Sequence, residues 1–188
     1  MSTAAHTKKL LADSLKSMMN TVLLEKISVE QLTRQCGISR NTFYYHFQDK
    51  YQLVSWIFYQ EATPILRHYG EAGQWADGLL ALCRHMRQER SFYTAAFRYE
   101  GQNSLTDSLL ALCRQIIDGM LVERAVTNTW ERQVVASFYA HALSGTIVEW
   151  ARAGMPQDPE QAVEIIRRLF RGEYFWVDSP AIDPCNNS

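Results

Sequence analysis

The sequence of 188 residues predicts an all-α fold, and three observations support this prediction. No segment shows the sustained alternation of apolar and polar residues that is typical of strands. Apolar residues recur instead at helical spacing along almost the whole chain, as in the stripe from Leu11 to Leu23. Capping residues, glycines and prolines interrupt the pattern where helices are expected to begin and end. The hydrophobic fraction of 47% and the charged fraction of 21% are typical of a folded globular protein.

The first fifty residues contain three predicted helices in close succession. The first covers about residues 7–24 and carries the apolar stripe. Ser28 is expected to cap the second helix, with Gln31 completing a capping box, and Gly37 is expected to end it. Ser39 can cap a third helix over residues 40–47. A helix, a tight turn and a second helix are laid out in this way in a helix-turn-helix.

Six further helices are predicted, at about residues 50–63, 75–90, 91–99, 105–124, 130–153 and 158–174. Asp49 is expected to cap the first of these, and Thr63-Pro64 to kink or end it. Gly70 and Gly73 mark a loop. Asp158 is expected to cap the last helix, with Pro159 at its first position and Gln161 completing another capping box.

Charge is distributed unevenly along the chain. Residues 1–50 carry seven Lys and Arg against four Asp and Glu, whereas the rest carries twelve Arg against sixteen acidic residues. Every lysine lies in those first fifty residues. A basic N-terminal part on an acidic body indicates a polyanionic partner for the N-terminal part, although so small an excess also arises by chance.

Several classes of protein find no support in the sequence. No apolar run reaches the length of about 18 residues that spans a membrane, and the start of the chain lacks the apolar core of a secretory signal. We therefore expect a cytoplasmic location. The four cysteines form no zinc-spaced cluster, so no metal or cofactor is predicted, and three of them are expected to pack as small hydrophobes. No nucleophile elbow, phosphate-binding loop or zinc-protease motif indicates an enzyme.

The residues at the start of the third helix have the chemistry of base recognition. Arg40 can bind guanine through two hydrogen bonds, Asn41 can bind adenine in the same way, and the methyl group of Thr42 can contact thymine. Ser28 and Lys50 each stand at a helix N-terminus, where backbone N–H groups favour a phosphate. The alternative is that three short helices share this spacing only as part of an all-α core.

The segment from residue 27 to 53 also resembles the N-terminal pattern of the TetR-type regulators. The match includes the turn residue Gly37, the Tyr44-x-His46-Phe47 sequence and Lys50 three residues further on. Ser28 and Cys36 are mild departures, because threonine and alanine are usual at these positions. The aromatic residues at 43–47 and 56–59 are similar to a subgroup that includes activators of dihydroxyacetone-kinase operons.

The resemblance implies an all-α homodimer that binds a near-palindromic double-stranded DNA operator. Residues 1–50 would form the helix-turn-helix domain, residues 51–177 a ligand-binding and dimerisation domain of about six helices, and residues 178–188 a disordered tail. A small-molecule effector or a protein co-regulator would act on the body. The resemblance places phosphate contacts on Tyr44, His46 and Lys50. It places base contacts on Arg40, Asn41, Thr42 and Tyr45. Ser28, at its helix N-terminus, and Lys8, in the basic N-terminal segment, complete the candidate DNA-binding residues.

Two further sets of residues follow from the resemblance. The last two helices would pair with their symmetry mates through Ser137, Ala140, Ser144, Gly145, Val148, Val163, Ile166, Leu169 and Phe170. An effector pocket would be lined by Trp56, Tyr59, Tyr93, Phe97, Phe138 and His141. For each residue of both sets, ordinary packing in the core is the alternative. A protein-interaction module without DNA binding is the alternative function.

Overall fold

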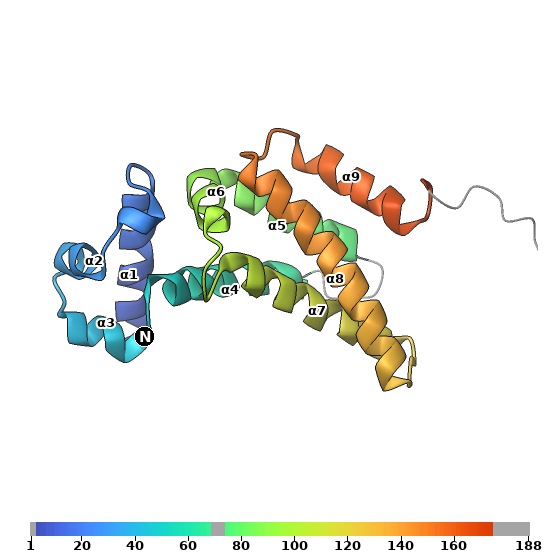
Figure 1. The fold of residues 1–188 in the computed structure, drawn as a ribbon, viewed down its shortest axis with the longest axis horizontal. Helices are drawn as coiled ribbons and strands as arrows, with labels where there is room; N and C mark the ends of the chain where they lie inside the picture. The colour runs from blue at the N-terminus through green and yellow to red at the C-terminus, as the bar shows by residue number, and fades with distance from the viewer. Residues whose placement is uncertain (1–2, 69–73, 175–188) are drawn as a thin grey trace, which may run out of the picture.

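The computed structural model describes residues 3–68 and 74–174, and every regular element within these ranges is helical. Figure 1 shows a small N-terminal group of helices, the head, joined by one long helix to a larger group, the body. The all-α fold predicted from the sequence is therefore confirmed. The predicted loop at Gly70 and Gly73 and the predicted tail at residues 178–188 lie outside the described residues.

The head consists of α1 (Thr3–Met19), a short 3-10 helix η1 (Leu24–Lys26), α2 (Val29–Cys36) and α3 (Arg40–His46). The capping box at the start of α2 is confirmed, because the backbone N–H of Gln31 donates to Ser28 Oγ at 3.1 Å and that of Ser28 to Gln31 Oε1 at 2.8 Å. Gly37 ends α2 with a φ of 64°, a left-handed conformation that glycine adopts without strain. The sequence did not predict η1, since a helix of three residues has too little periodicity to detect.

Helix α4 (Lys50–His68) runs from the head into the body (Figure 1). The carboxylate of Asp49 caps it as predicted and accepts a hydrogen bond from the backbone N–H of Gln52 at 2.7 Å. Of the two outcomes expected at Thr63-Pro64, a kink or an end, the end is wrong, because α4 continues to His68. Proline removes one backbone hydrogen bond, to residue 60, and Gln60 is exposed, so water can replace the missing donor.

The body contains α5 (Trp75–Gln88), α6 (Arg90–Arg98), α7 (Leu105–Glu123), α8 (Thr129–Arg152) and α9 (Pro159–Phe170). Helices α7 and α8 pack against each other along most of their length, while α9 packs on α5. Pro159 stands at the start of α9 as predicted, but the capping box of Asp158 and Gln161 is absent. The Asp158 carboxylate instead accepts a hydrogen bond from Arg87 of α5 at 2.5 Å, so it ties two helices together rather than capping one.

One hydrophobic core runs through both parts of the molecule, from Leu11 in the head to Ile166 in the body. Cys83 and Cys113 are buried in it as small hydrophobes, as predicted, and burial raises the pKa of each thiol to about 12. Cys36 is half-buried. Because the head shares this core with the body, the orientation of α3 depends on the packing of α1 and α4.

Candidate DNA-binding site

Helix α3 has two faces of opposite character. Phe43 and Phe47 are buried, with ring centroids 5.9 Å apart, and they anchor the helix to the core. On the other face Arg40 and Asn41 are exposed, and Tyr45 is 83% exposed. Burying an aromatic ring is favourable, so an exposed tyrosine ring does not contribute to the stability of the fold. The exposure of Tyr45 therefore indicates a surface that binds a partner.

The remaining predicted residues of α3 lie at the edges of this exposed face. The hydroxyl groups of Thr42 and Ser39 are 2.9 Å apart and hydrogen-bonded, which fixes the Thr42 methyl group at the start of the helix. Tyr44 is exposed, and the half-exposed ring of His46 packs edge-on against Tyr45 with ring centroids 5.0 Å apart. The six residues predicted on α3 thus share one surface that is continuous along the helix.

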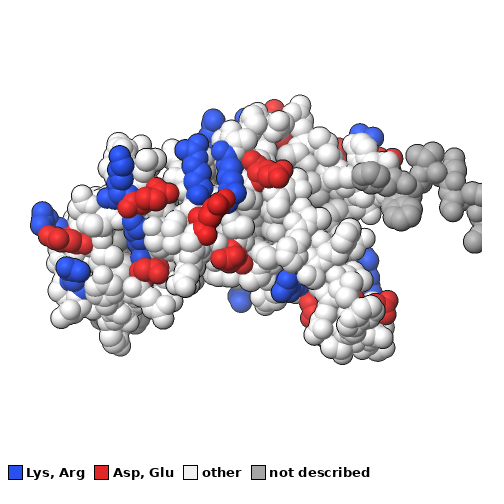
Figure 2. Space-filling view, viewed as in Figure 1, with Lys and Arg blue, Asp and Glu red and all other residues white. Residues whose placement is uncertain are grey.

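Lys8 lies on the side of the anchoring rings, at the junction of α1, α3 and α4. Its ammonium group is 5.6 Å from the centre of the Phe47 ring and 5.9 Å from that of Trp56. A cation is attracted to the electron-rich face of an aromatic ring, so these rings hold the Lys8 charge next to α3. Figure 2 shows Lys and Arg side chains interleaved with Asp and Glu over the visible face of the head, so that face has no large area of one sign.

Lys50 makes contacts that the sequence did not predict. Its Nζ donates hydrogen bonds to the backbone carbonyls of Leu24 at 2.7 Å, Glu25 at 2.9 Å and Ile27 at 2.7 Å. These three acceptors use all three protons of the ammonium group. Burial lowers the pKa of Lys50, although the nearby carboxylates of Glu25 and Asp49 oppose this effect. The side chain therefore holds the end of η1 against the start of α4, where the sequence led us to expect a free phosphate contact.

We expect Lys50→Met to lower the free energy of unfolding by about 1–3 kcal/mol, because carbonyls at η1 would lose their donor. Denaturant unfolding of variant and wild type would measure this loss. The salt dependence of DNA binding separates this role from the one predicted from the sequence. The slope to compare is that of the logarithm of the DNA-binding constant against the logarithm of the salt concentration. If the variant kept the stability of the wild type but this slope became shallower by about 1, the ammonium group would be in contact with a phosphate.

The six residues predicted to line an effector pocket do not come together. Tyr93 and Phe97 are fully buried in the core, and Trp56 packs against Phe47, with ring centroids 5.9 Å apart. Phe138 is 68% exposed and His141 is exposed, so both lie on the outer surface of α8. Aromatic residues at helical spacing serve the core and the surface alike, and spacing alone does not distinguish these roles.

Tyr59, the remaining member of that set, lines two open grooves. One groove, of about 300 Å³, lies between α4 and α7 and is lined by Gln52, Ser55, Tyr59, Asn103, Ser104, Asp107, Ser108 and Ala111. The other follows α4 past Gln60, Thr63, Pro64 and Arg67. The Tyr59 hydroxyl donates to the carbonyl of Ser108 at 3.2 Å, so a polar contact fixes the ring at the wall between them.

The residues predicted for dimer contacts divide into two groups. Ala140, Ser144, Val148, Val163 and Ile166 are buried within the chain itself and pack in its own core. A side chain enclosed by its own chain has little surface left for a second copy, so a dimer contact through these five residues stays a prediction that their burial does not favour. Of the others, Gly145 and Leu169 are exposed, and Ser137 and Phe170 are half-buried.

Among the exposed apolar side chains of α8 and α9, the sequence predictions included Leu169 as a dimer contact and Phe138 as a pocket residue, but they missed Trp130, Val134 and Ile165. Trp130, Val134 and Phe138 follow one another at intervals of four residues on α8, and Trp130 is 74% exposed. Ile165 and Leu169 are exposed on α9 with the same spacing. This spacing was visible in the sequence, but α8 also carries buried residues at helical spacing, so the pattern did not show which stripe faced outward.

Within the described residues, no group of three or more His, Cys, Asp or Glu side chains is arranged to hold a metal ion. In the same part of the chain, no helix has both the length and the apolar character needed to cross a bilayer.

The chain matches known proteins along both the head and the body. Residues 24–56 match the bacterial regulatory proteins of the tetR family, and residues 73–172 match a transcriptional regulator C-terminal region of the same family. The HTH-type dhaKLM operon transcriptional activator DhaS of Lactococcus lactis is 31% identical over 91 residues, which are 48% of this chain and 49% of that protein. The chain thus aligns with about half the length of this curated relative.

Solved structures with the same fold cover nearly the whole chain. The dihydroxyacetone kinase operon activator DhaS has a TM-score of 0.65 at 22% identity, over 89% of this chain and 95% of its own. FadR of Thermus thermophilus, a repressor solved in complex with lauroyl-CoA, has a TM-score of 0.64 at 12% identity, over 93% and 98%. NalD of Pseudomonas aeruginosa, the secondary repressor of a multidrug efflux pump, has a TM-score of 0.58 at 18% identity, over 90% and 97%.

An exposed, polar and aromatic α3 on a buried apolar base, following α2 and a tight turn, is the arrangement of a helix-turn-helix. The chain belongs to the TetR family of bacterial transcriptional regulators, since the family match to the body alone covers more than half of its residues. The function predicted from the sequence, a regulator of the TetR type, is confirmed.

Proposed function

We propose that the protein binds a near-palindromic operator as a homodimer and reads its bases with α3. The observation that carries this proposal is the exposed face of α3, where Arg40, Asn41 and Tyr45 point away from the anchoring rings of Phe43 and Phe47. Thr42 completes the base-reading residues. Ser28, Tyr44 and His46 contact phosphates, and Lys8 and Lys50 add positive charge beside them.

The proposed reading head corresponds to residues 1–50 and the proposed regulatory body to residues 51–177. Helix α4 begins at the boundary between them, which supports a division at this point. The boundary separates functions rather than cores, because the hydrophobic core continues across it.

Selection of bound sequences from random double-stranded DNA tests the proposal. We expect the full chain to enrich a near-palindrome whose half-sites are about one DNA turn or slightly more apart. The affinity should also fall steeply with salt concentration. A protein that enriches no sequence and shows no salt-dependent binding to DNA fragments would instead be the interaction module that the sequence left open as an alternative.

Arg40→Ala and Asn41→Ala should each cost about 1–3 kcal/mol of binding free energy at particular base pairs and relax selectivity there. Neither should change the melting temperature much, because both side chains are exposed. Binding to a panel of single-base operator variants, measured beside thermal melts, checks both statements. Variants that unfold the head and leave base preference intact would contradict the proposed orientation of α3.

The second copy in the proposed homodimer packs against the exposed apolar residues of α8 and α9. Helix α9 lies beside α8, where Phe170 and Tyr139 have ring centroids 5.0 Å apart, so the two helices can offer a joint surface. Trp130, Val134 and Phe138 form an exposed apolar stripe along α8, and a contiguous apolar surface of this kind is typical of an interaction site. A two-fold axis would bring this surface against its own copy and remove these side chains from water.

Phe138→Glu should weaken the dimer about thirtyfold, because it removes an aromatic contact and leaves a carboxylate in an apolar interface. Sedimentation at a series of protein concentrations measures the dissociation constant. Leu23→Glu, at an exposed leucine of the head, is the matched control and should leave the dimer unchanged. Equal dissociation constants for wild type and Phe138→Glu would place the dimer contact elsewhere.

The body would receive the controlling signal, a small ligand or a protein co-regulator. The groove between α4 and α7 supports a ligand role, because it adjoins the helix that enters the head and is lined by hydroxyl, amide and carboxylate groups. FadR, which shares the fold, was solved with lauroyl-CoA bound. Thermal melts of the full chain against a panel of acyl-CoA esters and polyols would identify the ligand by a concentration-dependent rise in melting temperature.

A further inference from the structure

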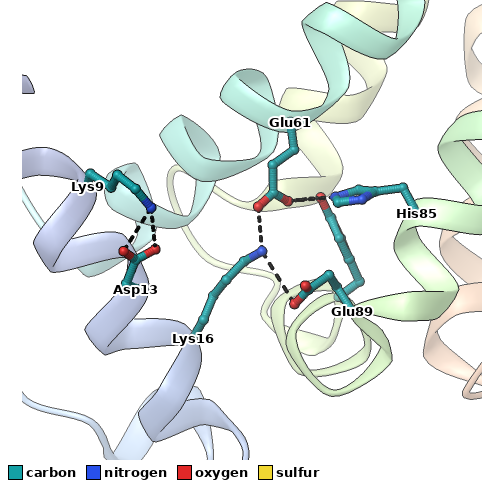
Figure 3. Close-up of polar contacts among 7 residues, drawn as sticks. Lys9, Asp13, Lys16, Glu61, His85 and Glu89 are labelled. Carbon is teal, nitrogen blue, oxygen red and sulfur yellow. Dashed lines mark hydrogen bonds and ion pairs between the residues drawn. The ribbon is translucent and has the colours of Figure 1, made fainter.

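One carboxylate joins the head to three helices of the body. Glu61 of α4 accepts a hydrogen bond from the Tyr93 hydroxyl of α6 at 2.7 Å, and its Oε2 lies 2.9 Å from Nε2 of His85 on α5. Its other oxygen bonds the ammonium group of Lys16, which belongs to α1 of the head. Figure 3 shows the side chains of His85 and Lys16 converging on Glu61 from different helices.

Lys16 is held from other sides as well. Its ammonium group is 3.4 Å from a carboxylate oxygen of Glu89, at the junction of α5 and α6, and 5.1 Å from the centre of the Phe92 ring. Only 19% of the Lys16 side chain and 22% of the Glu61 side chain are exposed. Shielding from water strengthens an ion pair and its hydrogen bonds, so this contact differs from the exposed pair of Lys9 and Asp13 on the same helix.

The surroundings of Glu61 keep it ionised. Burial alone would raise its pKa, but hydrogen bonds from His85, Lys16 and Tyr93 outweigh burial and lower the pKa to about 2. The carboxylate therefore carries its charge throughout the neutral and mildly acidic range.

Hydrogen bonds fix an angle in a way that apolar packing does not, because they require both a distance and a direction. Lys16 stands near the end of α1, and α1 packs on α2, which in turn packs on α3. A shift of Lys16 relative to Glu61 would therefore tilt the whole head on the body.

We propose that Glu61 and Lys16 are positioning residues that fix the angle between the head and the body, and thereby set the spacing of operator half-sites that the dimer accepts. This inference rests on the proposed function, since spacing has meaning only for a dimer on DNA. One extra base pair moves a half-site by about 3.4 Å and turns it by about 35°. A head whose angle to the body is fixed cannot reach the displaced half-site, whereas a head free to tilt can still bind it.

The test measures affinity against spacing. The operator enriched by the wild-type chain is rebuilt with its central spacer shortened or lengthened by one and two base pairs. We expect the wild type to lose about tenfold or more in affinity for a change of one base pair. Glu61→Gln and Lys16→Met should each lose only about threefold or less, so the spacing profile broadens. Lys16→Arg, which keeps the charge, should retain the sharp profile.

Asp13→Asn is the matched control, because it removes an ion pair from α1 that does not reach the body. It should keep the wild-type profile. Variants that melt earlier but keep a sharp spacing optimum would show a merely structural role and overturn the inference. A wild type that binds all spacings equally would also overturn it. If the wild type enriches no near-palindrome at all, the proposed function itself fails, before any variant is compared.

Discussion

Phe47→Ala should lower the free energy of unfolding by about 3–5 kcal/mol, because it leaves a cavity under α3. Phe47 is 3% exposed and packs against both Phe43 and Trp56, with ring centroids 5.9 Å away in each case. The lost ring also removes one of the two aromatic faces that hold the Lys8 ammonium. Denaturant unfolding at a fixed protein concentration measures the change.

Tyr45→Ala supplies the matched control for this prediction. Tyr45 is an aromatic residue of α3 only two positions away, but it lies in solvent, so its truncation should change stability by no more than about 0.5 kcal/mol. The same variant should bind DNA more weakly. If Tyr45→Ala unfolded the head while Phe47→Ala left it intact, the buried and exposed faces of α3 would be assigned the wrong way round.

Glu61→Gln should lower the free energy of unfolding by about 3 kcal/mol at neutral pH. Hydrogen bonds from His85, Lys16 and Tyr93 outweigh burial, which opposes them, and lower the pKa of Glu61 from 4.5 to about 2. Each pKa unit corresponds to about 1.4 kcal/mol of stability. A carboxylate whose pKa is lower in the folded state stabilises the fold fully above its unfolded pKa, and the contribution is lost as the pH falls toward the folded pKa.

The difference in the free energy of unfolding between wild type and Glu61→Gln should therefore be constant above about pH 5. It should shrink between about pH 4.5 and pH 2. Urea unfolding at a series of pH values checks this shape. Asp13→Asn should stay within about 0.5 kcal/mol of wild type, because its partner Lys9 is exposed. If the free energies of unfolding of wild type and Glu61→Gln followed parallel curves against pH down to pH 3, the ionised, hydrogen-bonded state of Glu61 would be contradicted.

Local signals in the sequence were sufficient to predict the head. The capping box of Ser28 and Gln31, the left-handed turn at Gly37 and the cap at Ser39 involve residues at most a few positions apart, so their chemistry is complete within a short segment. The same holds for Asp49 and Gln52 at the start of α4. The exposed face of α3 followed from these boundaries once Phe43 and Phe47 were taken as its buried side.

Contacts between distant segments could not be predicted in this way. Lys50 bonds carbonyls 23 to 26 positions earlier, and Glu61 bonds residues 24 to 45 positions away, with no periodic pattern to mark either contact. Asp158 was expected to cap α9, but Arg87 of another helix takes its carboxylate. On α8, small residues such as Ala140 and Ser144 suggested a contact between subunits, whereas they pack inside the chain.

The unbroken course of α4 has a mechanical consequence. Its 19 residues, at about 1.5 Å each, make a rod about 28 Å long with one end under the reading helix and the other in the body. A tilt of about 3° about its far end displaces the near end by about 1.5 Å, which is half the length of a hydrogen bond. The rod therefore acts as a lever: a small rotation of α4 within the body becomes a larger displacement at the surface that we propose to bind DNA.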